Sequence, residues 1–305
     1  MPWAINTKIR GTLPLTETIK YSVIVPCYNE AGGISSTIER LMAALSAVTA
    51  FETIIVDDGS DDGTVEIVKD LEASYSNLST ICHNRNRGYG AALKSGIRES
   101  AGELILIIDA DGTYPPEEAV TLIDMLKDAD MIVGARIGSD VSEPWLRAFP
   151  KRFLRWYCTW IAEQPIPDFN SGMRLFKKEI AERFLHILPD GFSFTTTITL
   201  AMMTNYLDVR FVPISYAKRI GRSKIRPIRD TLKFIELIVR TGCYFAPLRV
   251  FLPIGFGLGL LSVLSFLYDI FVLKNLTDKS VLLLLFTLNT FSFALLADMI
   301  DKRTQ

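Results

Sequence analysis

The sequence has few of the residues that build thiolate metal sites or disulfide frameworks. Its cysteines and histidines are widely scattered, with no CxxC pair: Cys27, Cys82, Cys158, Cys243, His83 and His186. This spacing argues against a zinc site and against a disulfide-stabilised fold. Reduced thiols are typical of the cytoplasm.

An apolar signal sequence is also missing. The first twenty residues, MPWAINTKIRGTLPLTETIK, lack the apolar stretch of a secretory signal, so we expect the N-terminal part of the protein to stay in the cytoplasm. The net charge of −1 hides an asymmetry along the chain. Acidic residues concentrate in the first half, and a cluster of basic residues lies between positions 218 and 249. No nucleic-acid partner is expected.

Charged residues are absent from two stretches near the C-terminus, Val250 to Tyr268 and Ser280 to Ala297. At ~1.5 Å per residue, a helix over the first stretch spans close to the ~30 Å hydrocarbon core of a bilayer. We therefore predict two transmembrane helices, about 250–273 and 280–298, within a C-terminal segment 250–305. A pair of buried core helices is the alternative.

The flanks of these stretches favour the membrane interpretation. Basic residues are frequent before the first stretch, and Lys302 and Arg303 follow the second. The positive-inside rule then places the N-terminal domain and both termini in the cytoplasm, with residues 274–279 as a short external loop.

Two segments have the composition of helices at a membrane surface. Residues 227–249 place Ile228, Leu232 and Ile235 on one side of a helix with basic residues elsewhere, which favours an interfacial helix over a soluble core helix. Residues 145–160 would carry an aromatic stripe and a cationic stripe, although Pro150 makes a continuous helix doubtful. That second helix either packs its aromatics on the domain or faces the membrane.

Residues 21–135 alternate short apolar runs with helix-length stretches. The runs 21–26, 52–58, 79–82, 103–111 and 130–136 are typical of strands, separated by helices such as 34–46 and 64–75. Runs that are apolar on both faces indicate an α/β fold with a mostly parallel sheet covered by helices on both faces. Ligands bind outside the carboxyl ends of such strands, where the polar residues of this chain lie.

The segment LILIIDADGTYPPEE, residues 104–118, carries two carboxylates to the end of a buried strand. Residues two apart in an extended chain point the same way, so Asp109 and Asp111 would face one hard cation. Mg²⁺ or Mn²⁺ typically takes one or two carboxylates together with phosphate oxygens. Gly112 would leave space for a diphosphate, so we expect a divalent metal and a nucleotide at this edge.

Seven motifs together resemble the family 2 glycosyltransferases with a GT-A fold, especially the polyprenyl-phosphate glycosyltransferases that include dolichol-phosphate mannose synthase. In chain order they are VIVPCYNE, IIVDDGSDDGT, NRGYGAALKSGI, LIIDADGTYPPE, VGAR, DFNSGMRLFKKE and YAKRIGRSKI. The resemblance covers residues 20 to about 230. It implies a cytoplasmic GT-A domain over residues 1–226.

The resemblance also implies roles for individual residues. The nucleotide would be bound by Pro26, Tyr28, Glu30, Asp57, Asp58 and Asp109, and the metal by Asp109, Asp111 and Thr113. The phosphates and the acceptor would be bound by Arg136, Asn170, Ser171, Arg219, Ser223 and Lys224, with Asp168 and Gly172 in the acceptor loop. The residues closest to the chemistry would be Asp109, Asp111, Asp168 and Arg219.

One position departs from the family pattern. Dolichol-phosphate mannose synthases usually have Gln two residues after the second acid, where this chain has Thr113. A hydroxyl at this position would contact the metal directly or through water, so the expected ligand set differs from that of the family.

A phosphate monoester is largely ionised at neutral pH, because its second pKa is about 6, so it needs cations more than a strong general base. The basic stretch 218–229 offers such cations close to the predicted membrane segments. We expect transfer of one sugar, with inversion, from a UDP- or GDP-sugar to a polyprenyl phosphate, either undecaprenyl or dolichyl. A homo-oligomer is left open. The alternatives are a diacylglycerol- or ceramide-type acceptor, with Asp168 as general base, and a catalytically silent nucleotide-sugar-binding scaffold.

Overall fold

The computed structural model describes residues 19–136, 145–191, 193–216, 240 and 242–304. They form two compact units. The first contains the described residues up to 136 together with 167–199 and 207–216, and the second contains 145–166, 200–206 and the C-terminal residues from 240 onward. The predicted domain boundary at 226 lies outside the described residues.

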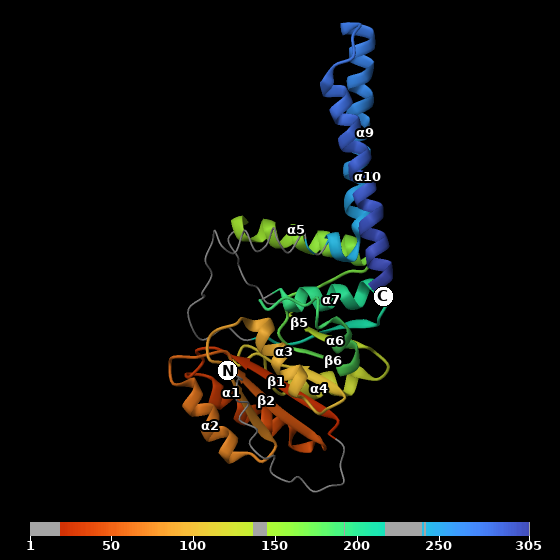
Figure 1. The fold of residues 1–305 in the computed structure, drawn as a ribbon. Coiled ribbons are helices and arrows are strands. Elements are labelled where there is room, and N and C mark those ends of the chain that lie inside the picture. The colour runs from red at the N-terminus through yellow and green to blue at the C-terminus, as the bar shows by residue number, and fades with distance from the viewer. Residues whose placement is uncertain (1–18, 137–144, 192, 217–239, 241, 305) are drawn as a thin grey trace. The chain divides into compact units, whose positions relative to one another are not determined.

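The first unit is built on a sheet with the strand order β3-β2-β1-β4-β6-β5-β7 (Figure 1). Its strands are β1 (Tyr21–Cys27), β2 (Phe51–Asp57), β3 (Leu78–Cys82), β4 (Leu104–Ile107), β5 (Met131–Ala135), β6 (Arg174–Lys177) and β7 (Val209–Pro213). In the described sheet, β6 pairs antiparallel with β4 and β5, and the other pairs are parallel. This confirms the mostly parallel sheet expected from the sequence.

Helices cover both faces of the sheet. They are α1 (Ile34–Ala44), followed by the 3₁₀ turn η1 (Leu45–Ala47), α2 (Thr64–Ser74), α3 (Tyr89–Glu99), α4 (Glu118–Leu126), α6 (Lys178–Phe184) and α7 (Phe194–Thr204), which continues into the second unit. Alternate strand residues such as Val23 and Ile55 form one buried cluster with residues of α1, α2 and α4. On the opposite face Gly96 of α3 lies against Ile24, with no room for a side chain. The α/β fold class is therefore confirmed.

Two strands, β6 and β7, were not identified from the sequence. The register of β6 pairs Ile107 of β4 with Arg174. Continuing that register by two residues places Asp109 opposite Gly172. A segment far along the chain is thus brought beside the predicted metal site.

In the second unit α5 runs without interruption from Trp145 to Ala162, so the doubt raised by Pro150 is not borne out. Pro150 is the sixth helical residue, so its missing N–H removes one intrahelical bond, the bond to the carbonyl four residues earlier, and the helix continues past it. The predicted aromatic stripe is present: Trp156 stacks on Trp160 with ring centroids 6.3 Å apart, and both remain exposed.

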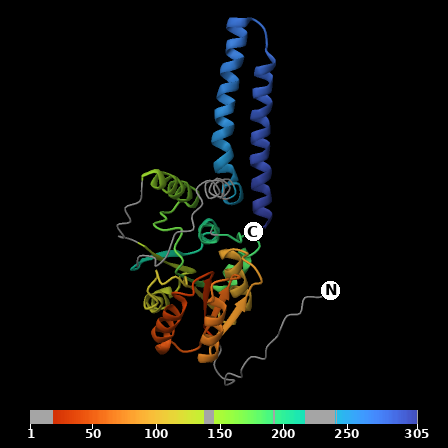
Figure 2. The same ribbon diagram turned by 90° about the vertical axis from the view of Figure 1, so that its left-hand side faces the viewer.

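Two long apolar helices end the chain. They are α9 (Pro247–Tyr268), extended by the π-helical turn η2 (Asp269–Leu273), and α10 (Asp278–Thr304). Both are long and apolar enough to cross a membrane, and Figure 2 shows them side by side. The first span begins at Pro247, slightly before the predicted 250, and most of the predicted interfacial helix lies outside the described residues.

A buried carboxylate closes the turn of this hairpin. One oxygen of Asp269, Oδ2, accepts hydrogen bonds from the N–H of Thr277 at 2.8 Å, from its hydroxyl at 2.7 Å and from the Ser280 hydroxyl at 2.7 Å. The Ser280 hydroxyl also lies 2.6 Å from that of Ser265 in α9. These bonds tie the end of the first apolar helix to the start of the second.

We expect Asp269→Ala to weaken the hairpin, because it leaves the N–H and hydroxyl of Thr277 and the hydroxyl of Ser280 without their common acceptor. Thermal unfolding of the detergent-solubilised protein, followed by circular dichroism, measures this as a lower midpoint. Asn275→Ala, at an exposed position of the same turn, is the control and should melt like the parent. Equal midpoints for all three proteins would show that the carboxylate adds no stability.

Candidate active site

The carboxyl edge of the sheet brings predicted site residues together from several strands. Asp57 ends β2 and Asp58 follows it, while Asp109 and Asp111 follow β4 and Arg136 follows β5. Parallel neighbours end at the same edge, so this clustering follows from the topology. The pairing of the strands therefore brings these residues to one edge of the sheet.

Asp109 is held on two sides by other segments of the chain. The Tyr89 hydroxyl, at the start of α3, donates to Asp109 Oδ1 at 2.9 Å. On the other side Gly172 approaches so closely that an added Cβ would lie 2.0 Å from Asp109 Oδ2. Burial and the nearby negative charge of Asp111 raise the pKa of Asp109 to about 6. Burial and the Asp109 charge also raise the pKa of Tyr89, so the phenol keeps its proton.

Asp111 does not continue the strand, which corrects one premise of the sequence analysis. Strand β4 ends at Ile107, not at 111, and a turn follows in which Gly112 has φ of +69°. The two carboxylates are thus neighbours across a turn, not same-facing residues of an extended strand. Asp111 Oδ1 accepts from the backbone N–H of Thr113 at 3.1 Å and from its hydroxyl at 2.6 Å.

Thr113 is almost fully buried, and its hydroxyl is engaged with Asp111. It is therefore placed to orient that carboxylate, and direct contact between Thr113 and a metal stays a prediction.

The carboxylates of Asp109 and Asp111 fit a divalent cation that takes its other ligands from a substrate. Among the described residues no group of three or more His, Cys, Asp or Glu side chains is arranged to hold a metal by itself. Two carboxylates from one turn leave most positions of a hard cation open to phosphate oxygens and water, the arrangement typical of Mg²⁺ bound with a nucleotide. The absent Cβ of Gly172 gives the Asp109 carboxylate the space it occupies.

The acids after β2 are both turned inward. Asp57 Oδ2 accepts from the N–H groups of Gly59 at 3.1 Å and Ser60 at 3.0 Å, which forms the loop that follows. Asp58 is 3% exposed and accepts from the N–H groups of Arg87 at 2.9 Å and Gly88 at 2.7 Å. These carboxylates shape the loops around the expected nucleotide, and direct contact with a base stays a prediction.

His83 was not selected from the sequence as a site residue. Its Nδ1 lies 2.7 Å from Asp58 Oδ1 and its Nε2 lies 2.9 Å from the Ser95 hydroxyl. It therefore links the end of β3 to the acid after β2 and to α3. The nearby motif NRGYG could have drawn attention to His83 in the sequence, but the motif does not show which side chains are buried.

The segment after β1 is tied to the β2 loop. Pro26 is buried in β1, while Tyr28 and Glu30 are partly exposed beyond it. Between them Asn29 adopts φ of +55°, and its side-chain amide donates to Asp61 at 2.7 Å. Pro26 thus lies in the strand, while Tyr28 and Glu30 lie on the loop after it, whose backbone N–H groups donate to side chains of the segment after β2.

Two of the residues predicted to lie on the acceptor side, Arg136 and Asp168, form an ion pair. The Arg136 guanidinium donates to Asp168 Oδ2 at 2.6 Å and Oδ1 at 2.8 Å, and its carbon lies 5.1 Å from the ring centre of Tyr216. Burial opposes ionisation of Asp168, but the hydrogen bonds from Arg136 outweigh it and hold the pKa of Asp168 below its usual value. Asn170 donates its N–H to Asp168 Oδ1 at 3.1 Å and accepts from Thr196 at 3.1 Å.

Behind this loop lies Arg174, a fully buried arginine that the sequence analysis did not select. Its guanidinium donates to the carbonyl of Ser171 at 2.6 Å, to the carbonyl of Thr195 at 3.0 Å and to the Thr199 hydroxyl at 3.1 Å. Ser171, predicted to touch the acceptor, is itself buried. The remaining acceptor residues, Arg219, Ser223 and Lys224, lie outside the described residues.

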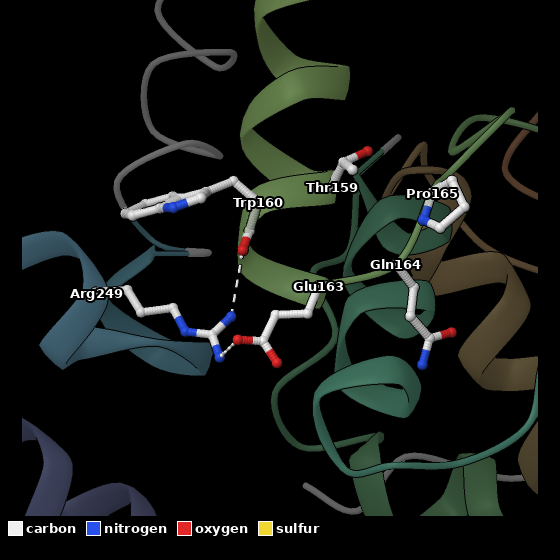
Figure 3. Close-up of a pocket in the computed structure, with 6 residues that line it drawn as sticks. All are labelled: Thr159, Trp160, Glu163, Gln164, Pro165 and Arg249. Carbon is white, nitrogen blue, oxygen red and sulfur yellow. Dashed lines mark hydrogen bonds and ion pairs between the residues drawn. The ribbon is translucent and has the colours of Figure 1, made fainter.

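A pocket in the second unit contains none of the predicted site residues. It is lined by Thr159, Trp160, Glu163, Gln164, Pro165 and Arg249 (Figure 3). Arg249 donates to the carbonyl of Ile161 at 2.7 Å and pairs with Glu163, so it caps the end of α5 from the start of α9. The pocket therefore lies where α9 contacts the end of α5 within that unit.

The raised pKa of Asp109 makes a prediction about pH. A folded-state pKa of about 6 lies above the usual ~3.9, so ionisation of Asp109 disfavours the folded state as pH rises through 6. In EDTA, Asp109→Asn should therefore melt above the parent at pH 7.5, with the difference shrinking toward about pH 4. Adding Mn²⁺ with UDP or GDP should stabilise the parent but not the variant. A constant difference across this pH range would contradict the assignment.

The close approach of Gly172 to Asp109 leads to a second prediction. In Gly172→Ala the new methyl group must displace the Asp109 carboxylate, so binding of Mn²⁺ with UDP or GDP should weaken by about 10-fold or more. Isothermal titration calorimetry measures the affinity. Gly257→Ala is the matched control, because Gly257 lies in α9 and an added Cβ there meets nothing within 4 Å. Unchanged affinity in Gly172→Ala would mean that Asp109 does not contact the metal.

Solved structures with similar folds include two metal-bound transferases. A glucosyl-3-phosphoglycerate synthase from Mycobacterium tuberculosis, in complex with Mn²⁺, UDP and glucosyl-3-phosphoglycerate, aligns with a TM-score of 0.54 at 19% identity, over 73% of this chain and 78% of that one. A mannosyltransferase from Pyrobaculum calidifontis, in complex with GDP-Man and Mn²⁺, aligns with a TM-score of 0.52 at 17% identity, over 94% and 88%. At these identities the likeness shows the GT-A fold.

Sequence relatives are transferases of the same kind. The chain is 28% identical to the low-salt glycan biosynthesis hexosyltransferase of Haloferax volcanii, over 80% of this chain but only 58% of that protein. It is also 28% identical to the undecaprenyl-phosphate 4-deoxy-4-formamido-L-arabinose transferase of Pseudomonas savastanoi pv. phaseolicola, over 80% and 71%.

Two family models match separate parts of the chain. Residues 246–302 match the GtrB C-terminal hairpin. Residues 22–185, which include the carboxylates after β2 and β4 and the Arg136–Asp168 pair, match glycosyl transferase family 2. The protein belongs to glycosyl transferase family 2 and is a glycosyltransferase with a GT-A fold.

Proposed function

We propose that this enzyme transfers a single sugar, with inversion and with a divalent metal, from a UDP- or GDP-sugar to a polyprenyl phosphate. The observation that carries the proposal is the meeting of Asp109 and Asp111 with the Arg136–Asp168 pair at one edge of the sheet. Carboxylates for a metal-bound diphosphate thereby lie near a cation suited to a second phosphate. The relatives that act on undecaprenyl phosphate support this acceptor class.

The reaction needs no strong base from the protein. An oxygen of the acceptor phosphate forms the new bond to the anomeric carbon as the bond from that carbon to the nucleoside diphosphate breaks. A divalent cation, when bound, neutralises charge on the departing diphosphate. The carboxylates of Asp109 and Asp111 would hold that cation, and the Asp57 and Asp58 loops would hold the nucleotide.

The acceptor phosphate would be held by cations instead of being activated by a base. Arg136 is locked by Asp168 in a bidentate pair, which leaves its remaining N–H donors in a fixed direction. Arg219, Ser223 and Lys224 are proposed as further contacts on the sequence pattern.

A hydroxyl acceptor such as a diacylglycerol or a ceramide is less well supported. It would need a general base, and the candidate was Asp168. Its low pKa and its two bonds from Arg136 suit Asp168 to orienting the arginine, not to accepting a proton. A silent scaffold is also disfavoured, because the carboxylates that a metal requires are retained.

We further propose that the hairpin of α9 and α10 anchors the enzyme in the bilayer, with the catalytic unit and both termini in the cytoplasm. The apolar helices and the exposed tryptophans of α5 support a membrane location, since such rings are common at the membrane surface. The orientation rests on the charge pattern of the sequence.

A panel of radiolabelled UDP- and GDP-sugars, offered to sealed right-side-out vesicles with undecaprenyl or dolichyl phosphate, tests the proposal. We expect one donor to give a labelled polyprenyl-phosphate sugar, and only after the vesicles are permeabilised, because the site would face inward. Product without permeabilisation contradicts the orientation. Label in a diacylglycerol or ceramide product contradicts the acceptor.

The same assay includes a catalytic control. Asp111→Asn should lose most of the product, at least ~10²-fold, and EDTA should have the same effect on the parent. Full activity in EDTA would exclude the metal from the reaction.

A further inference from the structure

Tyr89 lies in the triplet Gly88-Tyr89-Gly90, whose glycines are both required by close packing. An added Cβ on Gly88 would lie 2.3 Å from the carbonyl oxygen of Asp190, and Gly88 also has φ of +110°. An added Cβ on Gly90 would lie 2.1 Å from the carbonyl oxygen of Pro189. The backbone on both sides of Tyr89 is therefore pressed against residues 189–191.

Further bonds fix the same short segment. The N–H of Gly88 donates to Asp58 Oδ2 at 2.7 Å, and the N–H of Ala91 donates to the carbonyl of Asp190 at 3.1 Å. The triplet is thus anchored at its start by the acid after β2 and at its end by the loop before α7. These contacts fix the position of the Tyr89 backbone, from which its hydroxyl reaches Asp109.

That hydroxyl meets Asp109. It donates to Oδ1 at 2.9 Å, while the other carboxylate oxygen faces Gly172. A carboxylate can only accept, so the phenol is the donor. Hydrogen bonds to the carboxylates that ligate a metal fix their orientation, and removing such a partner typically costs 10–100-fold in metal affinity or activity.

We propose that Tyr89 is a positioning residue for the metal site and that the flanking glycines serve to deliver its hydroxyl to Asp109. The inference rests on the proposed metal role of Asp109 and extends it to a residue outside the DxD motif. It also links the nucleotide side to the metal side, because the same segment is bonded to Asp58. Tyr89 does not touch the reacting atoms in this assignment.

Binding of Mn²⁺ in the presence of UDP, and separately of GDP, tests the inference on the full-length protein in detergent. Free Mn²⁺ is measured by electron paramagnetic resonance for the parent, Tyr89→Phe, Tyr206→Phe and Asp109→Asn. Tyr89→Phe removes one oxygen and keeps the ring, so a thermal melt should show a folded protein. Tyr206→Phe is the matched control, because Tyr206 is 91% exposed.

We expect Tyr89→Phe to bind Mn²⁺ about 10-fold more weakly, Tyr206→Phe to bind like the parent, and Asp109→Asn to lose most binding. In turnover assays, raising Mn²⁺ should restore much of the rate lost in Tyr89→Phe, which a general loss of structure would not allow. Parent-like Mn²⁺ affinity in Tyr89→Phe, with binding lost in Asp109→Asn, overturns the inference and leaves the proposed function standing. Parent-like binding in Asp109→Asn overturns the metal assignment and the inference together.

Discussion

The carboxylate of Asp109 lies where three distant segments of the chain meet, and the candidate site depends on how it is held. Strand β4 delivers it to the sheet edge, Tyr89 donates to one oxygen, and Gly172 packs against the other. Burial and the negative charge of Asp111 raise the pKa of this crowded carboxylate, although the hydrogen bond from Tyr89 acts in the opposite direction. A nearby divalent cation would favour the ionised form of both carboxylates, because opposite charge lowers the pKa of an acid.

The antiparallel strand β6 is the element that makes this crowding possible. Its pairing with β4 places Gly172 opposite Asp109, and the buried Arg174 holds the preceding Ser171 carbonyl from behind. Burying a guanidinium is costly unless its donors are satisfied, and the Arg174 bonds to Ser171, Thr195 and Thr199 meet that need. The same loop carries Asp168, so the residues predicted to hold the metal and the residues predicted to bind the acceptor are supported by one segment of the chain.

Several aspartates of the described residues accept hydrogen bonds from nearby backbone N–H groups and hydroxyls. Asp57 and Asp58 accept backbone N–H groups that define the loops beside them, and Asp269 accepts three donors at the turn of the apolar hairpin. In each case a carboxylate fixes the backbone where regular secondary structure ends. Acidic residues at strand ends are therefore part of the scaffold, whatever their role in the reaction.

The sequence by itself determined the strand and helix alternation, the two apolar C-terminal helices and the gathering of carboxylates after β2 and β4, because these follow from local periodicity and from the rule that parallel strands end at one edge. Only the tertiary structure decided that Asp111 turns away from the strand, that Asp58 faces inward and that Tyr89 reaches Asp109. Those contacts join residues up to tens of positions apart, and they depend on the register of β6 and on close backbone packing at Gly88 and Gly172. Local sequence patterns carry no information about such distances, since they arise only when the folded segments meet.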